Sequence, residues 1–145
     1  MSDTHFYDVD VVWSGERKGI ASSETLNDLE VATPPEFPKG HPGIWSPEHL
    51  YVAAANSCLM TTFLAIAENS KLEFSKFSCK GKGKLEKVDG KFLITEIILE
   101  PSVQIPKEAD REKAIKIIHK SEAACLISNS MKTEVKLGEI SISVA

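Results

Sequence analysis

The sequence lacks the excess of positive charge that nucleic-acid binders and membrane-surface proteins need. Its 17 lysines and arginines are outnumbered by 21 aspartates and glutamates, and the formal net charge is −4. Because phosphate backbones and anionic lipid surfaces are bound through basic patches, this balance argues against both as partners. We therefore expect neither nucleic acid nor a membrane among the partners of this protein.

Membrane segments and export signals are also missing from the pattern. No apolar run reaches the roughly 20 residues that span a bilayer, and the stretch from Met1 to His5 has no basic segment leading into an apolar one. These absences predict a protein without a signal peptide. The cytoplasm is the expected location.

Cysteine occurs only three times, at Cys58, Cys79 and Cys125. In a reducing compartment so few thiols are poor material for a structural disulfide framework, so any pairing is expected to be transient and catalytic. Cys79 lies among lysines and is interpreted as a surface or edge cysteine. The four histidines share no ligand spacing with one another or with the cysteines, so neither a metal nor another cofactor is expected.

What is present fits a single α+β domain over residues 1–145. With 42% hydrophobic residues the chain can bury a core. Alternating apolar residues predict an opening hairpin, Asp89-Gly90 predicts the turn of a second one, and helical spacing predicts two helices. The expected order is strands at 6–13, 18–23 and 27–32, a helix at 46–67, strands at 74–88 and 91–99, a helix at about 107–128 and a strand at 133–144. Lys80-Gly-Lys-Gly-Lys84 is expected to weaken the middle of the 74–88 strand, and a slip in the apolar pattern at Gly138 predicts a bulge in the last strand.

The helix that begins near Ser46 organises the rest of the chain. Ser46 can cap the first turn, Pro47 needs no N–H there, and Glu48 opposes the positive helix end. Several alanines before Cys58 would let other elements pack closely, so we expect a central helix. Cys58 is then either an inert core residue or the centre of the chemistry.

A reactive Cys58 would need a donor or a cation near its thiolate. It lies well beyond the first turn, too far along for its own helix N-terminus to help, so a reactive Cys58 is expected to require an outside cation. Of the two arginines, Arg17 stands at a strand end beside a glycine turn, whereas Arg111 falls in an exposed first turn. Cys125 lies on an apolar face of the second predicted helix, so packing of the two helices could bring the sulfurs together.

Glu48 precedes Cys58 by ten residues, which is about 15 Å along a helix. A carboxylate at that distance reaches the thiol only through a bridging arginine or from a second subunit. The spacing therefore predicts a homodimer with composite sites.

Four motifs follow one another along the chain: Trp13-Ser-Gly-Glu-Arg17, Ser46-Pro-Glu48-His-Leu, Ala54-Ala-Asn-Ser-Cys58 and Cys125-Leu-Ile-Ser-Asn-Ser130. In this order and spacing they resemble the OsmC/Ohr family of osmotically induced and organic-hydroperoxide-resistance proteins. The proline-rich loop at 33–43 and Trp45 are closer to its general OsmC-like branch. The resemblance implies an intertwined α+β homodimer with antiparallel sheets, a long central helix, a second cysteine-bearing helix and two active sites at the interface.

The resemblance also implies an activity, the thiol-dependent reduction of organic hydroperoxides, with hydrogen peroxide as a second candidate substrate. Cys58 would be the peroxidatic cysteine and Cys125 the resolving one. Arg17 would stabilise the thiolate, and Glu48 would orient Arg17. An external dithiol would reduce the resulting disulfide. A second hypothesis stays open, that of a non-enzymatic dimer that binds a small apolar ligand or senses oxidants.

Overall fold

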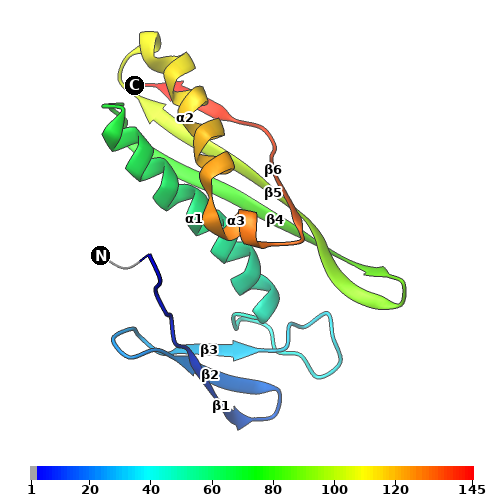
Figure 1. Cartoon of the computed structure of the whole chain (residues 1–145). Coiled ribbons are helices and arrows are strands. Elements are labelled where there is room, and N and C mark those ends of the chain that lie inside the picture. The colour runs from blue at the N-terminus through cyan, green and yellow to red at the C-terminus, as the bar shows by residue number, and fades with distance from the viewer. Residues whose placement is uncertain (1–2) are drawn as a thin grey trace. The chain divides into compact units, whose positions relative to one another are not determined.

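The computed structural model, described for residues 3–145, divides into two compact units (Figure 1). The N-terminal unit ends at Leu50, and the C-terminal unit runs from Tyr51 to Ala145. Strands and helices follow one another in the predicted order, so the α+β class is confirmed. The single domain predicted over residues 1–145 stays a prediction.

The N-terminal unit is a three-stranded antiparallel sheet. Its strands are β1 (Asp10–Gly15), β2 (Lys18–Ser22) and β3 (Leu29–Ala32), in that spatial order. The predicted opening hairpin is confirmed, and its turn uses positive φ at Gly15 and Glu16. The first strand was predicted to start at Phe6, which is wrong because its ladder with β2 ends at the pair Asp10 and Ser22.

A long hairpin is the centre of the C-terminal unit. It consists of β4 (Lys76–Val88) and β5 (Lys91–Ile105), joined at Asp89 and Gly90, which both have positive φ as the predicted turn requires. The Lys80-Gly-Lys-Gly-Lys84 stretch, expected to weaken this strand, pairs residue for residue with β5, and the register shifts only after Lys84. A Cβ added at Gly83 would lie 2.5 Å from Val52 Cγ2. The glycines therefore let the helix that carries Val52 approach the sheet closely.

The closing strand was predicted as one segment with a bulge at Gly138. It is instead two strands, β6 (Glu134–Leu137) and β7 (Ser141–Val144), which both pair in parallel with β5. Gly138 N–H donates to Leu99 O, and the Glu139 N–H donates to a carboxylate oxygen of Glu100. These bonds draw the backbone out of the ladder between the two strands.

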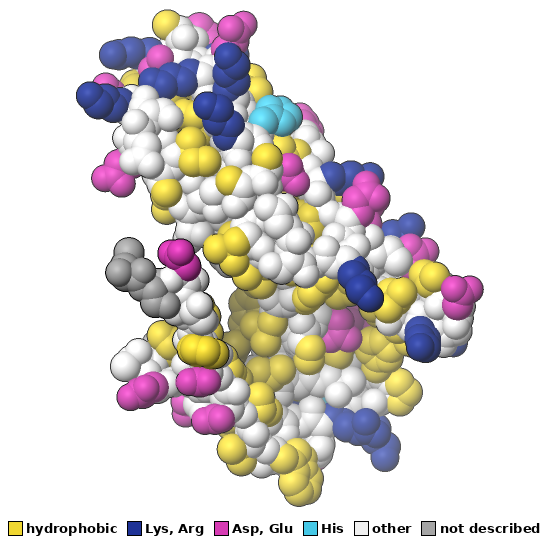
Figure 2. Space-filling model, viewed as in Figure 1, with side chains coloured by type: hydrophobic (Ala, Val, Ile, Leu, Met, Phe, Trp, Pro, Cys, Tyr) yellow, Lys and Arg dark blue, Asp and Glu magenta, His cyan; other side chains and the backbone are white. Residues whose placement is uncertain are grey.

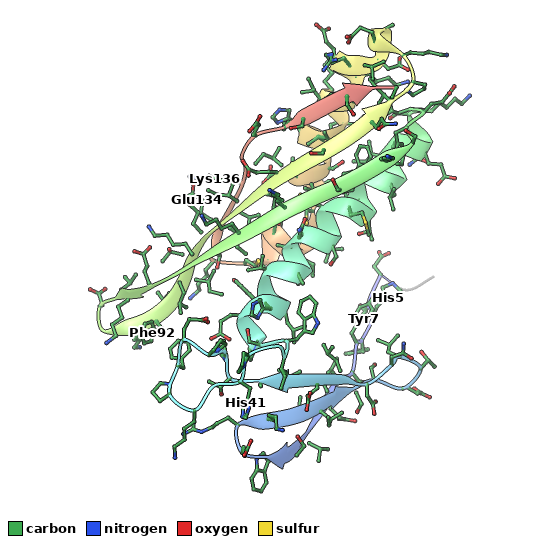
Figure 3. The ribbon with its side chains drawn as sticks, turned by 180° about the vertical axis from the view of Figure 1, so that it is seen from behind. His5, Tyr7, His41, Phe92, Glu134 and Lys136 are labelled. Atoms are coloured by element: carbon green, nitrogen blue, oxygen red, sulfur yellow. The ribbon has the colours of Figure 1, made fainter. Side chains whose placement is uncertain are left out.

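Helices cover one face of this second sheet. The views in Figures 1 and 3 place α1 (Pro47–Asn69) and α2 (Arg111–Ala124) on the same face, and Figure 3 shows the other face without a helix. The core between them is formed by Phe63, Leu59, Ile97, Val103 and Ile118, all almost fully buried. This packing fixes the middle of α1 on the sheet.

The second predicted helix is broken at Cys125. A short 3₁₀ turn, Glu108–Asp110, leads into α2, and a separate helix α3 (Leu126–Ser130) follows it. Cys125 between them has extended backbone angles, φ −66° and ψ 109°. The Asn129 side chain donates to the Ala123 carbonyl, and the Asn129 N–H donates to the Cys125 carbonyl. Asn129 therefore ends one helix while its own backbone continues the next.

Among residues 3–145, α1 is the one helix long and apolar enough to cross a membrane by length and composition. The expectation that no apolar run reaches this length is therefore wrong. Its apolar residues include Leu59 and Phe63, which are buried in the core of the C-terminal unit. The core helix of a soluble protein meets the same criterion, so this finding is weak support for a membrane segment.

Candidate active site

The structure brings Cys58 and Cys125 together inside the C-terminal unit. Cys58 projects from the inner face of α1, next to the buried Leu59. Cys125 is held in the link between α2 and α3. The two side chains are hydrogen-bonded to each other, and both cysteines are free and buried. Two residues far apart in the sequence thus form one pair of thiols.

The two thiols of this pair have opposite tendencies to ionise. Burial alone would raise the pKa of Cys58, but hydrogen bonds from Cys125, the backbone of Ile127 and Leu126, and Thr62 hold that pKa below its usual value. Burial and the hydrogen bond with Cys58 raise the pKa of Cys125, and the Ser128 hydroxyl opposes this only in part. Cys58 is therefore the thiol that ionises first.

The start of α3 supplies the backbone part of this effect. The interruption of the helix at Cys125 leaves the first N–H groups of α3 without helical partners. The N–H groups of Leu126 and Ile127 instead donate to the Cys58 sulfur. The expectation that a reactive Cys58 requires an outside cation left out these backbone donors, which already lower its pKa. The role predicted for Arg17 stays a prediction.

Arg17 and Glu48 both belong to the N-terminal unit, where they line one groove of about 730 Å³. Arg17 is exposed, and its side chain forms no ion pair among residues 3–145. One carboxylate oxygen of Glu48, Oε1, is buried without a hydrogen-bond partner in that same range. An unpaired buried carboxylate oxygen is costly, so this atom is ready for a cationic or N–H partner.

The groove beside Arg17 and Glu48 is mainly apolar. Apolar side chains from the strands and from the proline-rich loop form most of its wall, and charged groups stand at its margin. Such a lining suits an apolar molecule with one polar end. The lining residues are Val11, Trp13, Glu16, Arg17, Lys18, Gly19, Val31, Ala32, Thr33, Pro34, Phe37, Pro38, Pro47 and Glu48.

The predicted cap of α1 is confirmed, and it includes His49, which was not predicted as the partner of Ser46. Ser46 is fully buried, and its Oγ accepts from the His49 N–H at 3.1 Å. The His49 Nδ1 lies 2.6 Å from Ser46 Oγ and accepts from the Ser46 N–H at 3.3 Å. This reciprocal pair is a capping box in which histidine takes the place usual for glutamate. It fixes the turn that carries Glu48.

Cys79 lies outside the thiol pair, on β4. Burial raises the pKa of Cys79 to about 11, with smaller effects from the neighbouring Glu100. Its carbonyl accepts from the Asn56 side chain, which ties β4 to α1. A thiol with such a pKa stays protonated at neutral pH and is a poor nucleophile.

Residues 3–145 contain no cluster of three or more histidine, cysteine, aspartate or glutamate side chains that could hold a metal ion. Two sulfurs in contact, one favoured as thiolate and the other as thiol, can exchange between dithiol and disulfide.

Sequence reasoning missed the donors around the sulfurs. Thr62 lies four residues after Cys58, one helical turn along the same face, so the spacing could have revealed it. Ser128 follows Cys125 by three residues and donates to its sulfur at 3.4 Å. The backbone donors of α3 carry no sequence signal, because any residue type supplies an N–H except proline.

Comparison with known proteins identifies the family. The sequence profile of the family described as OsmC-like protein matches residues 40–139, which is more than half of the chain. The chain is a member of the OsmC/Ohr family. The OsmC-like fold that the four motifs predicted is confirmed, and the match covers α1, both thiols and the long hairpin.

Two curated relatives span nearly the whole of this OsmC-like chain. An uncharacterized protein, YmaD of Bacillus subtilis, is 29% identical over 140 residues, which cover 94% of this chain and 93% of the relative. The peroxiredoxin OsmC of Escherichia coli is 29% identical over 130 residues, which cover 86% and 89% respectively. The family therefore includes a named peroxiredoxin.

Solved structures agree on the OsmC-like fold. An OsmC-like protein of unknown function from Vibrio cholerae superposes with a TM-score of 0.86 at 24% identity, covering 94% of this chain and 99% of the other. An organic hydroperoxide resistance protein OsmC from Legionella pneumophila has a TM-score of 0.73 at 22% identity, covering 97% and 100%. At these identities the likeness supports the fold alone.

Proposed function

We propose that this protein is a thiol-dependent peroxidase that reduces organic hydroperoxides with Cys58 and Cys125. The observation that carries the proposal is the hydrogen-bonded pair of buried thiols, in which Cys58 has a lowered pKa and Cys125 a raised one. A peroxide-reducing cysteine must attack as a thiolate, and its resolving partner must remain a thiol within reach. Membership of a family that includes a named peroxiredoxin supports the same reading.

The proposed reaction balances in three steps. The Cys58 thiolate attacks the terminal oxygen of R–O–O–H, the O–O bond breaks, and the alkoxide takes a proton to leave as an alcohol. The sulfur, oxidised by two electrons, becomes a sulfenic acid. The Cys125 thiol condenses with it, which forms the S–S bond and releases water. An external dithiol then reduces the disulfide by exchange and is itself oxidised to a disulfide. Hydrogen peroxide would follow the same course, with water as the leaving product.

Arg17 and Glu48 are proposed as the polar half of the site. Both line the groove of the N-terminal unit, and the unpartnered Glu48 Oε1 suits an arginine as its partner. A guanidinium held in this way would stabilise the Cys58 thiolate and the departing alkoxide. Because Glu48 and Cys58 are ten positions apart on α1, we propose that Glu48 of one subunit serves the Cys58 of the other.

A homodimer is proposed from apolar surface that each unit leaves open. All residues of β1 before Gly15 are exposed, including Val11, Val12 and Trp13. Figure 2 shows hydrophobic side chains gathered at the surface over the N-terminal strands. On α1, Met60 and Leu64 are exposed one turn apart. Exposed apolar area of this kind marks an interface, and a second copy of the chain would cover the same patches by two-fold symmetry.

The proposed setting is the reducing cytoplasm, where the three free thiols remain reduced until peroxide arrives. The reductant is proposed to be an external dithiol, because exchange with two linked thiols regenerates both cysteines in one turnover. No nucleic-acid or membrane partner forms part of this proposal.

Titration of the reduced protein with cumene hydroperoxide tests the activity. We expect about one peroxide consumed per subunit, two thiols lost, and a Cys58–Cys125 disulfide in the peptide map. Cys125→Ser should still consume peroxide but form no such disulfide, and Cys79→Ser should behave as the unmodified chain. Thiols that stay unchanged at equimolar peroxide would contradict the proposal.

Mixing of two inactive variants tests the shared site. If Glu48 acts across a two-fold interface, Cys58→Ser and Glu48→Ala subunits exchanged at equal amounts should recover about a quarter of the activity, because half of the dimers then hold one intact site. Mixtures no more active than their parents would place Glu48 and Cys58 of the same chain in one site or exclude Glu48.

A second candidate function is favoured by the groove itself. Its volume of about 730 Å³ and its apolar wall would admit a small apolar ligand without any reaction at the thiols. In that case Trp13 fluorescence should change when a non-oxidising apolar alcohol is added, while the thiols stay unreactive toward peroxide. Peroxide consumption in the titration above would decide for the enzyme.

A further inference from the structure

Hydroxyl side chains inside the helices follow a clear rule in this protein, and two of them break it. Ser57, Thr61, Ser121 and Ser130 each donate to a backbone carbonyl three or four residues earlier, at 2.6–3.2 Å. This is the ordinary bond of a helical serine or threonine. Four of the six serine and threonine hydroxyls within the described helices therefore bond only to the helix backbone.

The two exceptions are aimed at the two sulfurs. Thr62 Oγ1 lies 3.9 Å from Cys58 Sγ, and Ser128 Oγ donates to Cys125 Sγ at 3.4 Å. Thr61, the neighbour of Thr62, bonds the Cys58 carbonyl at 3.2 Å instead. Since Thr62 forgoes the carbonyl bond open to it, its hydroxyl is directed to the thiol rather than to the helix.

We propose that Thr62 is a catalytic residue, whose hydroxyl donates a hydrogen bond to the Cys58 thiolate and stabilises it for attack. This inference rests on the proposed function and adds a residue to it. The hydrogen bond between Thr62 and Cys58 becomes stronger on ionisation of the sulfur only if the hydroxyl is the donor, because a charged acceptor strengthens the bond.

The surroundings agree with that role. The Ser128 O–H points to Cys125, whose S–H points to Cys58, so this row of donors also ends at the Cys58 sulfur. Thr62 approaches the same sulfur from within α1. The lowered pKa of Cys58, which burial opposes, has Thr62 among its causes. Together these groups hold an anion without any cation from the C-terminal unit.

The test is the pH dependence of Cys58 alkylation by iodoacetamide, followed for that cysteine by peptide mass spectrometry. In Thr62→Val, which keeps the side-chain shape, the pKa of Cys58 should rise by about 0.7 unit, equal to about 1 kcal/mol at 1.36 kcal/mol per unit. At a pH below this pKa, the fraction of Cys58 present as thiolate then falls about fivefold. The remaining thiolate is more basic and reacts about twice as fast, so the alkylation rate falls roughly 2.5-fold. Above the pKa the rate should instead rise about twofold.

This crossing of the two profiles separates the proposed role from a structural one. A change in access to Cys58 would scale the rate equally at every pH. Thr62→Ser should return the midpoint to that of the unmodified chain, and Thr61→Val, which removes the neighbouring hydroxyl, should leave it in place. Thr62→Ala repeats the test should the valine variant not fold.

Profiles of Thr62→Val and Thr62→Ala that superpose on the unmodified one would overturn the inference, as would an equal shift in Thr61→Val. The assay uses no peroxide, so its outcome is independent of the peroxidase test. A chain that shows the shift but consumes no peroxide would keep Thr62 as the thiolate donor and lose the proposed activity. A chain that consumes peroxide without the shift would keep the activity and lose Thr62.

Discussion

Substitution of Gly83 by alanine probes how closely α1 lies against the long hairpin. The new methyl group would meet Val52 Cγ2 at 2.5 Å, about 1 Å or more inside an ordinary carbon–carbon contact. Valine is stiff at χ1, so the overlap cannot be relieved by the side chain alone. Overpacking of this kind costs about 1–3 kcal/mol, and alanine in a strand regains roughly 0.5–1 kcal/mol over glycine. The free energy of unfolding should fall by about 1–2 kcal/mol.

Urea denaturation at one fixed protein concentration measures this loss, since the stability of the proposed dimer would depend on concentration. The companion variant Val52→Ala removes the methyl groups that cause the overlap. In the double variant Gly83→Ala/Val52→Ala the new methyl occupies the vacated space, so its loss should be smaller than the sum of the single losses by about 1 kcal/mol or more. Gly81→Ala, whose Cβ would meet Asn56 Nδ2 at 3.0 Å, should cost less than Gly83→Ala. Strict additivity of the two substitutions would refute the close approach.

Three further outcomes follow from caps, burial and charge. Ser46→Ala removes the capping box and should lower the free energy of unfolding by about 1–2 kcal/mol, while Ser57→Ala, in the same helix but exposed, should change it by less than about 0.5 kcal/mol in urea denaturation. Burial holds the pKa of Cys79 at about 11, above its ordinary value of 9.0. The contribution of the Cys79 thiol to the free energy of unfolding should therefore be fully present below pH 9 and fall as the pH rises toward 11. A Cys79→Ser variant that loses as much stability over that range would contradict this. If Arg17 assists the thiolate, Arg17→Ala should slow Cys58 alkylation at neutral pH about threefold or more, and an unaltered rate would remove Arg17 from the site.

The sequence predicted those parts of the fold that local chemistry decides. The cap at Ser46 and the turn at Asp89-Gly90 both form as expected, because capping oxygens and positive-φ residues act on their nearest neighbours. The break at Cys125 was missed, because it depends on Asn129, whose side chain reaches six residues back to end α2. Helical periodicity alone continues through such a point.

The candidate site was predictable to the same extent. Two predicted helix faces indicated that Cys58 and Cys125 could meet, and the structure places their side chains together, although Cys125 lies between α2 and α3 and not on a helix. What surrounds the sulfurs could not follow from residue types, because the backbone N–H groups of Leu126 and Ile127 become donors only through the bend before them. The glycines of β4 were likewise taken for weakness, since a close approach to Val52 is visible only in three dimensions.

The bend at Cys125 gives the protein a mechanical property as well. Because this residue is extended rather than helical, closing the proposed Cys58–Cys125 disulfide would turn the link between α2 and α3 rather than unwind a helix. The N–H groups of Leu126 and Ile127 that meet the Cys58 sulfur would then face a neutral disulfide in place of a thiolate, which weakens their hydrogen bonds. In the proposed reaction, the reduced and oxidised forms would therefore differ at the start of the five-residue helix α3.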